Sequence, residues 1–480
     1  MIRCLFKWCP SLKFGVWRLA FGVEPAAGTV ASDDTAKKSS GRCAGLNAKR
    51  QTPNFKRQIG IILLFIAATA APAATVTRGP YLQNATPTSI VIRWRTDVPT
   101  PGRVRFGTAP DALTLSASDP ALTTEHEIAI TGLPSDTAYL YAVGDGTTDL
   151  AGPDNEHWFR TLPVAGAAQP VRVWVLGDSG TGGDGSGRAE SVFSAYLNSP
   201  NFRHNDVWLM LGDNAYGVGS DEEYQRAVFQ TYTRLLPHTR LWSTLGNHET
   251  LTAGGAPYFN LFTLPRAGEA GGVASGTESY YSFDVANIHF VCLDSMVSSR
   301  APGSPMLTWL EADLDATTQK WIVAFWHHPP YSHGTHNSDT EIELIEMREN
   351  VLPILEAHNV DLVLTGHSHG YERTFLLDGH YGVSTTLVPA MKKDGGSGQP
   401  TAPAPATTGA YIKTAAAHSG AVYVVAGNGG QPPFIASPHA AMFTQIAVLG
   451  SLVLDVNGSR LDAKMIDNTG AIRDFFTIVK

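Results

Sequence analysis

Residues 171–178 read VRVWVLGD and residues 207–213 read VWLMLGD, and these two stretches decide the fold of the larger part of this 480-residue chain. Three further apolar runs also end on polar side chains: LWSTLGNH at 241–248, WIVAFWH at 321–327 and VDLVLTGH at 360–367. Short continuous apolar runs are typical of strands buried on both faces of a sheet. The sequence therefore predicts five buried strands, each leading directly into a polar residue.

Amphipathic helical stretches alternate with these strands, for example at 222–236, where Asp221 is the expected N-cap, and at 341–357. Strands and helices in alternation indicate an α/β layer structure. Ligands of such sheets gather beyond the carboxyl ends of the strands, and a glycine before four of the five polar endings allows close backbone approach. We expect the five endings to converge on one site.

The region from 75 to 163 has a different pattern, with short alternating segments such as SIVIRWR at 89–95, separated by Pro, Gly, Asp and Thr clusters. This pattern predicts an all-β domain. The segment 128–141 places a tyrosine after a turn, as in immunoglobulin-like and fibronectin-type sandwiches. We predict a β-sandwich over 75–163, a linker over 164–170, and a catalytic domain over 171–480 with a surface loop at 395–409 and closing strands after 421.

An apolar run, IGIILLFIAATA at 59–70, follows Lys56 and Arg57 and precedes the small residues APAA. A basic start, a short apolar core and small residues predict a signal peptide, assigned to 58–74, with cleavage shortly after Ala73. The run is too short for a stable membrane span, which needs about 20 apolar residues. We expect a secreted or periplasmic protein and interpret residues 1–57 as a leader from a misassigned start.

The composition excludes one class of partner and places one cysteine in the core. A formal net charge of −8 and a pI near 6.0 indicate no basic surface of the kind that binds nucleic acid.

Cys4, Cys9 and Cys43 fall in the leader, so only Cys292 remains in the exported chain and no internal disulfide is expected. Cys292 and His289 lie in an apolar run and are predicted to be core residues.

The polar residues that follow the predicted strands are of the types that bind metal ions, and none of them is a serine. The sequence holds no phosphate loop in which Lys is followed by Ser or Thr. A hydrolase with these residues would take its nucleophile from metal-bound water, and the donors exceed what one ion can use, so two ions should share a carboxylate. The candidate residues are Asp178, Asp213, Tyr216, Asn247, His248, His327, His367 and His369.

Five blocks in order resemble the purple acid phosphatases: GDSG at 177–180, GDNAY at 212–216, GNHE at 246–249, HHPPY at 327–331 and GHSHGYER at 366–373. The resemblance implies a fibronectin type III-like N-terminal domain and a four-layer α/β/β/α metallophosphoesterase domain. It also implies a ferric ion held by Asp178, Asp213, Tyr216 and His369, and a divalent zinc, iron or manganese ion held by Asp213, Asn247, His327 and His367. His248 and His336 match substrate-side catalytic histidines.

The resemblance implies an acid phosphatase that hydrolyses small-molecule phosphate monoesters by attack of metal-bound hydroxide. A phosphodiesterase using the same binuclear site is the first alternative. A non-catalytic binding or adhesion protein, in which the sandwich is the working module, is the second. The sandwich is expected to contribute no ligand, since its His126 and His157 lie outside every motif. The motifs identify neither the physiological substrate nor the oligomeric state.

Overall fold

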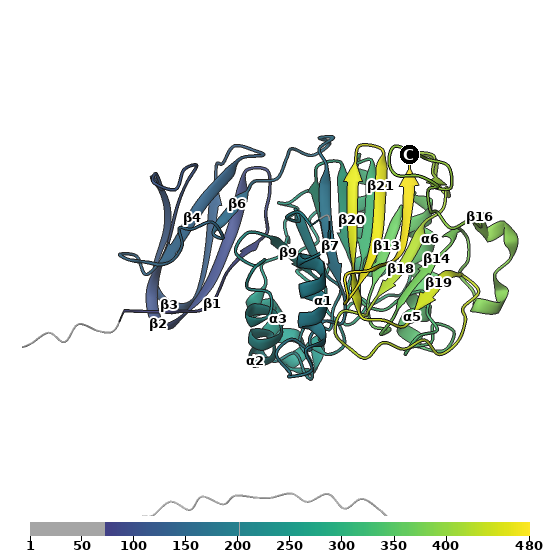
Figure 1. Ribbon diagram of the computed structural model, residues 1–480, viewed down its shortest axis with the longest axis horizontal. Coiled ribbons are helices and arrows are strands. Elements are labelled where there is room, and N and C mark those ends of the chain that lie inside the picture. The colour runs from purple at the N-terminus through teal and green to yellow at the C-terminus, as the bar shows by residue number, and fades with distance from the viewer. Residues whose placement is uncertain (1–72, 201) are drawn as a thin grey trace, which may run out of the picture. The chain divides into compact units, whose positions relative to one another are not determined.

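The computed structural model describes residues 73–480 except residue 201, so the leader and almost all of the predicted signal peptide lie outside the described residues (Figure 1). The first described part is all β, as predicted. Its long second strand is antiparallel to the first, third and fourth strands. Trp94 of the second strand pairs with His126 of the third, and their ring centroids are 4.6 Å apart. The strands are β1 (Val76–Gln83), β2 (Ser89–Gly107), β3 (Leu115–Thr131), β4 (Ala138–Gly144), β5 (Asp149–Ala151) and β6 (Trp158–Arg160).

The larger part of the chain, from residue 171 onward, contains two sheets. In the first, the predicted strands β7 (Val171–Leu176), β8 (Val207–Met210) and β9 (Arg240–Ser243) run parallel. The chain returns at its end to add antiparallel strands beside β7, drawn in yellow in Figure 1. These closing strands are β20 (Gly450–Asn457), β21 (Arg460–Asp467) and β22 (Ile472–Val479), with the short β17 (Tyr411–Ile412) beyond them.

The second sheet has β12 (Trp321–Phe325) and β13 (Leu362–Thr365) at its centre, again parallel, as expected for the other two apolar runs. The sheet order is β10 (Tyr281–Val285), β11 (Ile288–Cys292), β12, β13, β18 (Val422–Ala426), β14 (Tyr371–Thr374) and β19 (Met442–Ile446). Strands β15 (Leu376–Leu377) and β16 (Lys392–Asp394) form a separate ribbon.

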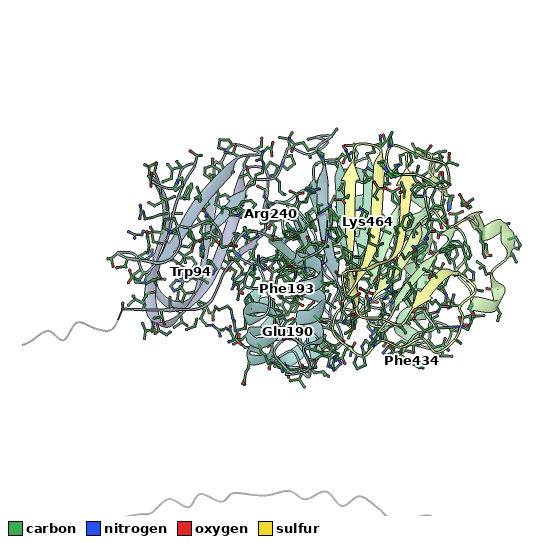
Figure 2. The ribbon with its side chains drawn as sticks, in the orientation of Figure 1. Trp94, Glu190, Phe193, Arg240, Phe434 and Lys464 are labelled. Atoms are coloured by element: carbon green, nitrogen blue, oxygen red, sulfur yellow. The ribbon has the colours of Figure 1, made fainter. Side chains whose placement is uncertain are left out.

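Alternating side chains of the second sheet face two different cores. Trp321, Val323 and Phe325 pack with residues of the first sheet, whereas Ile322 and Ala324 pack with the helices α4 (Pro305–Ala316) and α6 (Leu352–Ala357). Helix α1 (Arg188–Leu197) covers the first sheet. Its Tyr196 stacks on Trp174 with ring centroids 4.6 Å apart. Phe193, which Figure 2 labels, has its ring centroid 5.9 Å from that of Trp174. The order of layers is therefore α/β/β/α, as predicted.

The two expected helices are broken into shorter pieces. The first begins after Ser220, whose side chain accepts from the Glu223 N–H and forms a capping box, so the N-cap is Ser220 and not Asp221. It ends at 230 instead of 236, as α2 (Asp221–Tyr224) and the π-helix η1 (Gln225–Gln230). The second consists of α5 (Ile342–Glu346), the π-helix η4 (Met347–Val351) and α6. The remaining helices are α3 (Ala256–Leu261) and the 3-10 turns η2 (Glu249–Leu251), η3 (Ala253–Gly255), η5 (Ser384–Thr386) and η6 (Pro389–Met391).

The N-terminal β domain shares a core with the larger part. Strand β1 pairs with β9 at Leu82 and Arg240, and the Tyr141 hydroxyl donates to the Pro237 carbonyl at 2.7 Å. Asp221, displaced from its expected capping role, accepts hydrogen bonds from the guanidinium of Arg78 at 2.9 Å and from that of Arg95 at 2.7 Å. These contacts fix the sheet domain against the first sheet of the larger part.

Other predictions about individual residues are confirmed. Cys292 is fully buried, and His289 is a core histidine whose ring nitrogens lie 2.8 Å from Asp284 and 2.9 Å from Asp313. Residues 395–409 contain neither helix nor strand. Within the described residues 73–480, residue 201 excepted, none of the helices combines the length and apolar character that crossing a bilayer requires.

Candidate metal centre

Five strand endings from the two sheets meet at one place. Asp178, Asp213 and Asn247 follow β7, β8 and β9 of the first sheet, whereas His327 and His367 follow β12 and β13 of the second. Asp178, Asp213 and His367 have positive φ angles of 55°, 51° and 65°, an uncommon conformation that turns the chain sharply at the end of each strand.

The glycines before the ligand candidates act mainly through close packing. A Cβ atom at Gly246 would lie 2.3 Å from the backbone nitrogen of Asp213, and one at Gly366 would lie 2.5 Å from a carboxylate oxygen of Asp178. Of the four, only Gly212 also has a positive φ, of 89°. Glycine is thus required here because neighbouring strand ends almost touch.

Three of the predicted ligands form a first group of donor atoms. The Tyr216 hydroxyl lies 3.2 Å from Oδ1 of Asp178 and 3.5 Å from Nε2 of His369. The third side of this triangle, from His369 Nε2 to Asp178 Oδ1, is 3.6 Å. A phenol, a carboxylate and an imidazole therefore face a common point.

A second group of three donor atoms lies on the other side of the site. The Asn247 side-chain oxygen is 3.1 Å from Nε2 of His327 and 3.1 Å from Nδ1 of His367. The two imidazole nitrogens are 3.2 Å apart. His327 is held in this orientation because its Nδ1–H donates to the Leu211 carbonyl at 2.8 Å.

Asp213 lies between the two groups. Its Oδ1 is 3.5 Å from Nε2 of His327, and ligand atoms of Asp178, Asp213 and His327 all lie within 4.8 Å of one another. On the other side of the site, the pKa of Tyr216 is raised mainly by burial and by the charge of Asp178. The charge and hydrogen bonding of Asp213 raise it further. Asp213 is the carboxylate placed to be shared.

The donor set fits two metal ions. Donors that share one ion tetrahedrally at bonds of about 2.0–2.2 Å lie about 3.3–3.6 Å apart, close to the spacing in both groups. Burial and the neighbouring Asp213 charge raise the pKa of Asp178 well above its usual value, so the ionised pair requires cations. Burial lowers the pKa of His327 to about 3 and of His367 and His369 to about 4, which leaves neutral imidazoles able to bind metal.

Both predicted substrate-side histidines lie beside this donor set. The Nδ1–H of His248 donates to the Gly217 carbonyl at 2.6 Å, and its Nε2 lies 3.8 Å from Oδ2 of Asp213. The ring of His336 stacks on that of His367 with 3.6 Å between centroids. Each side chain is about one-third exposed, so each can meet a ligand from solvent.

Two carboxylates that the sequence reasoning missed also belong to the site. Glu249 is fully buried and accepts backbone N–H groups of Asp213, Asn214 and Gly246 at 2.7–2.8 Å. It closes the GNHE block, which could have indicated it. Glu341 lies 2.7 Å from Nδ1 of His336, and no spacing in the sequence pointed to it.

Comparison with known proteins agrees with this geometry. Residues 171–371 match the family described as calcineurin-like phosphoesterase, and residues 79–161 match the N-terminal domain of purple acid phosphatases. Among Arabidopsis thaliana proteins, the chain is 29% identical to purple acid phosphatase 15 over 52% of this chain and 49% of that protein. It is 32% identical to probable purple acid phosphatase 20 over 52% of this chain and 55% of that protein. The chain thus spans about half the length of these curated relatives.

Solved structures show the same fold. A purple acid phosphatase from yellow lupin (Lupinus luteus) seeds superposes with a TM-score of 0.66 at 18% identity, covering 85% of this chain and 75% of that one. PhoD superposes with a TM-score of 0.60 at 14% identity, covering 86% and 92%. The two matched domains follow one another in this chain with the five motif blocks in order. The matches of both domains and these relatives together support a purple acid phosphatase with a calcineurin-like phosphoesterase domain.

Proposed function

We propose that this protein is an exported metal-dependent phosphatase that hydrolyses small-molecule phosphate monoesters at a site with one ferric and one divalent ion. The observation that carries the proposal is the pair of donor groups with Asp213 between them. Asp178, Tyr216 and His369 would hold the ferric ion, because a phenolate is a hard anionic donor. Asn247, His327 and His367 would hold zinc, iron or manganese.

Two such ions would lower the pKa of a coordinated water and would neutralise charge on the phosphoryl group. The chain's own residues hold the two donor groups and the substrate-side His248 in position. Asp213 fixes the separation of the two donor groups, and Glu249 holds the backbone of Asp213 and Gly246. His248 keeps Nδ1–H on the Gly217 carbonyl, so its Nε2 is free to contact a phosphate oxygen or protonate the leaving oxygen.

The test combines metal analysis with an ester panel. Protein with two metals per chain should hydrolyse aryl phosphates between pH 4 and 8 and favour mono esters over bis esters. A strong preference for bis esters would make the protein a phosphodiesterase. Two bound metals with no turnover of either ester class would refute a hydrolytic role, and protein purified without iron or a second metal would support the binding alternative.

Export is part of the proposal and rests on the apolar segment at 59–70 with its basic and small-residue flanks. Expression of the full chain in a bacterium, followed by N-terminal sequencing of protein outside the cytoplasm, should find a start shortly after Ala73. A start upstream of Lys56 in the exported protein would contradict the assignment.

A further inference from the structure

We propose that Glu341 is a positioning residue that orients both the substrate-side His336 and the metal-ligand candidate His367. The inference rests on the proposed function, because it assigns His367 to the divalent ion. Glu341 precedes α5, and its side chain is about one-third exposed at the edge of the site. Ligand atoms of His336, Glu341 and His367 lie within 4.8 Å of one another.

The first contact sets the orientation of His336. The Oε2 atom of Glu341 is 2.7 Å from Nδ1 of His336, so Nδ1–H donates to the carboxylate. Nε2 is then the ring nitrogen free to meet a substrate. A carboxylate behind an imidazole fixes its tautomer and the orientation of its ring. His336 is thereby held as a rigid group at the mouth of the site.

The second contact concerns His367. Its Nδ1 belongs to the donor group with Asn247 and His327, while its Nε2 faces the same Oε2 atom of Glu341 at 3.7 Å. This distance is longer than a normal hydrogen bond, so Glu341 acts on His367 by charge and through the His336 ring stacked 3.6 Å away. Metal-binding histidines commonly have a carboxylate behind the nitrogen that does not bind metal, and its loss lowers metal affinity.

A purely structural role for Glu341 makes a different prediction. Its other oxygen, Oε1, accepts the Asn337 N–H at 2.6 Å and thereby closes the loop that carries His336. Glu341→Gln keeps an amide oxygen that can accept this N–H but removes the charge from both imidazoles. A loss in the Gln variant therefore reports on the histidines and not on loop closure.

The experiment compares the full-length protein with Glu341→Gln and with the matched control Glu349→Gln, an exposed glutamate of the same helical segment. The dissociation constant of the second, divalent ion is measured by competition with a chromophoric chelator. We expect affinity to fall about 10- to 100-fold in Glu341→Gln, to be unchanged in the control, and binding of the ferric ion to be unchanged in both.

Steady-state kinetics with an aryl phosphate, at saturating metal, test the contact with His336. Glu341→Gln should lower kcat/KM several-fold in the wild-type background and less than two-fold when added to His336→Ala, because the two residues act together. Wild-type metal affinity together with wild-type kinetics in Glu341→Gln would overturn the proposal. If the protein binds two metals but hydrolyses no ester, the proposed function fails, whereas the metal measurement still decides the role of Glu341.

Discussion

The hydroxyl of Tyr216 donates a 3.2 Å hydrogen bond to Oδ1 of Asp178, which brings a phenol and a buried carboxylate together at one side of the site. Burial and the charges of Asp178 and Asp213 raise the pKa of this phenol well above its ordinary value. Tyr216 can therefore be a phenolate only when a strongly charged cation is bound beside it.

Tyr216→Phe should abolish the colour of the iron-loaded protein. The wild type should show a broad visible band from phenolate-to-iron charge transfer, and the variant should lose it while Asp178, Asp213 and His369 retain the metal. Activity should fall less than colour, because Tyr216 anchors the ion without supplying the nucleophile. An unchanged visible spectrum in an iron-loaded variant would show that the phenol does not bind iron.

Asp213→Ala should be more damaging than the loss of any ligand that serves one donor group. Because Asp213 lies between both groups, the variant should lose both metals and about 10²- to 10³-fold or more in kcat/KM. His367→Ala is the comparison and should lose one metal of two. Elemental analysis after dialysis distinguishes the two results, and equal metal loss in both variants would contradict a shared carboxylate.

Glu249→Ala should destabilise the fold as well as the site. The variant leaves four buried backbone N–H groups, of Asp213, Asn214, Ala215 and Gly246, without this acceptor. At about 1 kcal/mol or more for each group, unfolding free energy should drop by about 4 kcal/mol or more. Thermal unfolding should reveal the drop, whereas the exposed Glu222→Ala should unfold like the wild type.

His289 should make stability depend on pH. Burial opposes its charge, but Asp284 and Asp313 raise its pKa to about 9 in the folded protein. Because the folded pKa lies above the unfolded value near 6.5, the protonated form stabilises the fold fully below pH 6.5, and this contribution is lost as pH rises through 9. A shift of this size corresponds to about 3 kcal/mol.

His289→Gln, which cannot titrate, should therefore be less stable than the wild type at pH 6 and approach it by pH 9.5. Urea unfolding of both proteins across this range measures the difference. A wild-type advantage that stayed constant with pH would show that His289 is neutral in the folded protein.

A fragment that begins at residue 171 and lacks the N-terminal domain should keep the metal centre but lose solubility. The N-terminal domain contributes buried residues such as Tyr81, whose hydroxyl donates to the Leu261 carbonyl at 2.7 Å, to the core beside the first catalytic sheet. Its removal exposes that apolar surface, yet every ligand candidate lies after residue 171. Size-exclusion chromatography and metal analysis test the two halves of this prediction, and a soluble fragment without metal would refute it.

The sequence by itself determined the strand pattern and most of the donor inventory. Short continuous apolar runs that end at a glycine or another turn are typical of strands buried on both faces of a sheet. The strands β7, β8, β9, β12 and β13 all follow this rule. The ordered motif blocks then named seven donors whose atoms the fold brings together. The first residue of helix α2 was harder to predict from the sequence, because Ser220 and Asp221 are both suitable N-caps. The local path of the backbone makes Ser220 the N-cap.

Only the tertiary structure decided which residues support the ligands. Asp178 and His367 are 189 residues apart, yet the His367 N–H donates to Oδ2 of Asp178 at 2.8 Å because strand ends from two sheets meet. Glu341 reaches His336 and His367 through the path of one irregular loop, which no periodicity encodes. Short-range sequence patterns specify which donor side chain follows each strand. The packing of the two sheets decides which strand ends face each other and which further carboxylate contacts the ligand histidines.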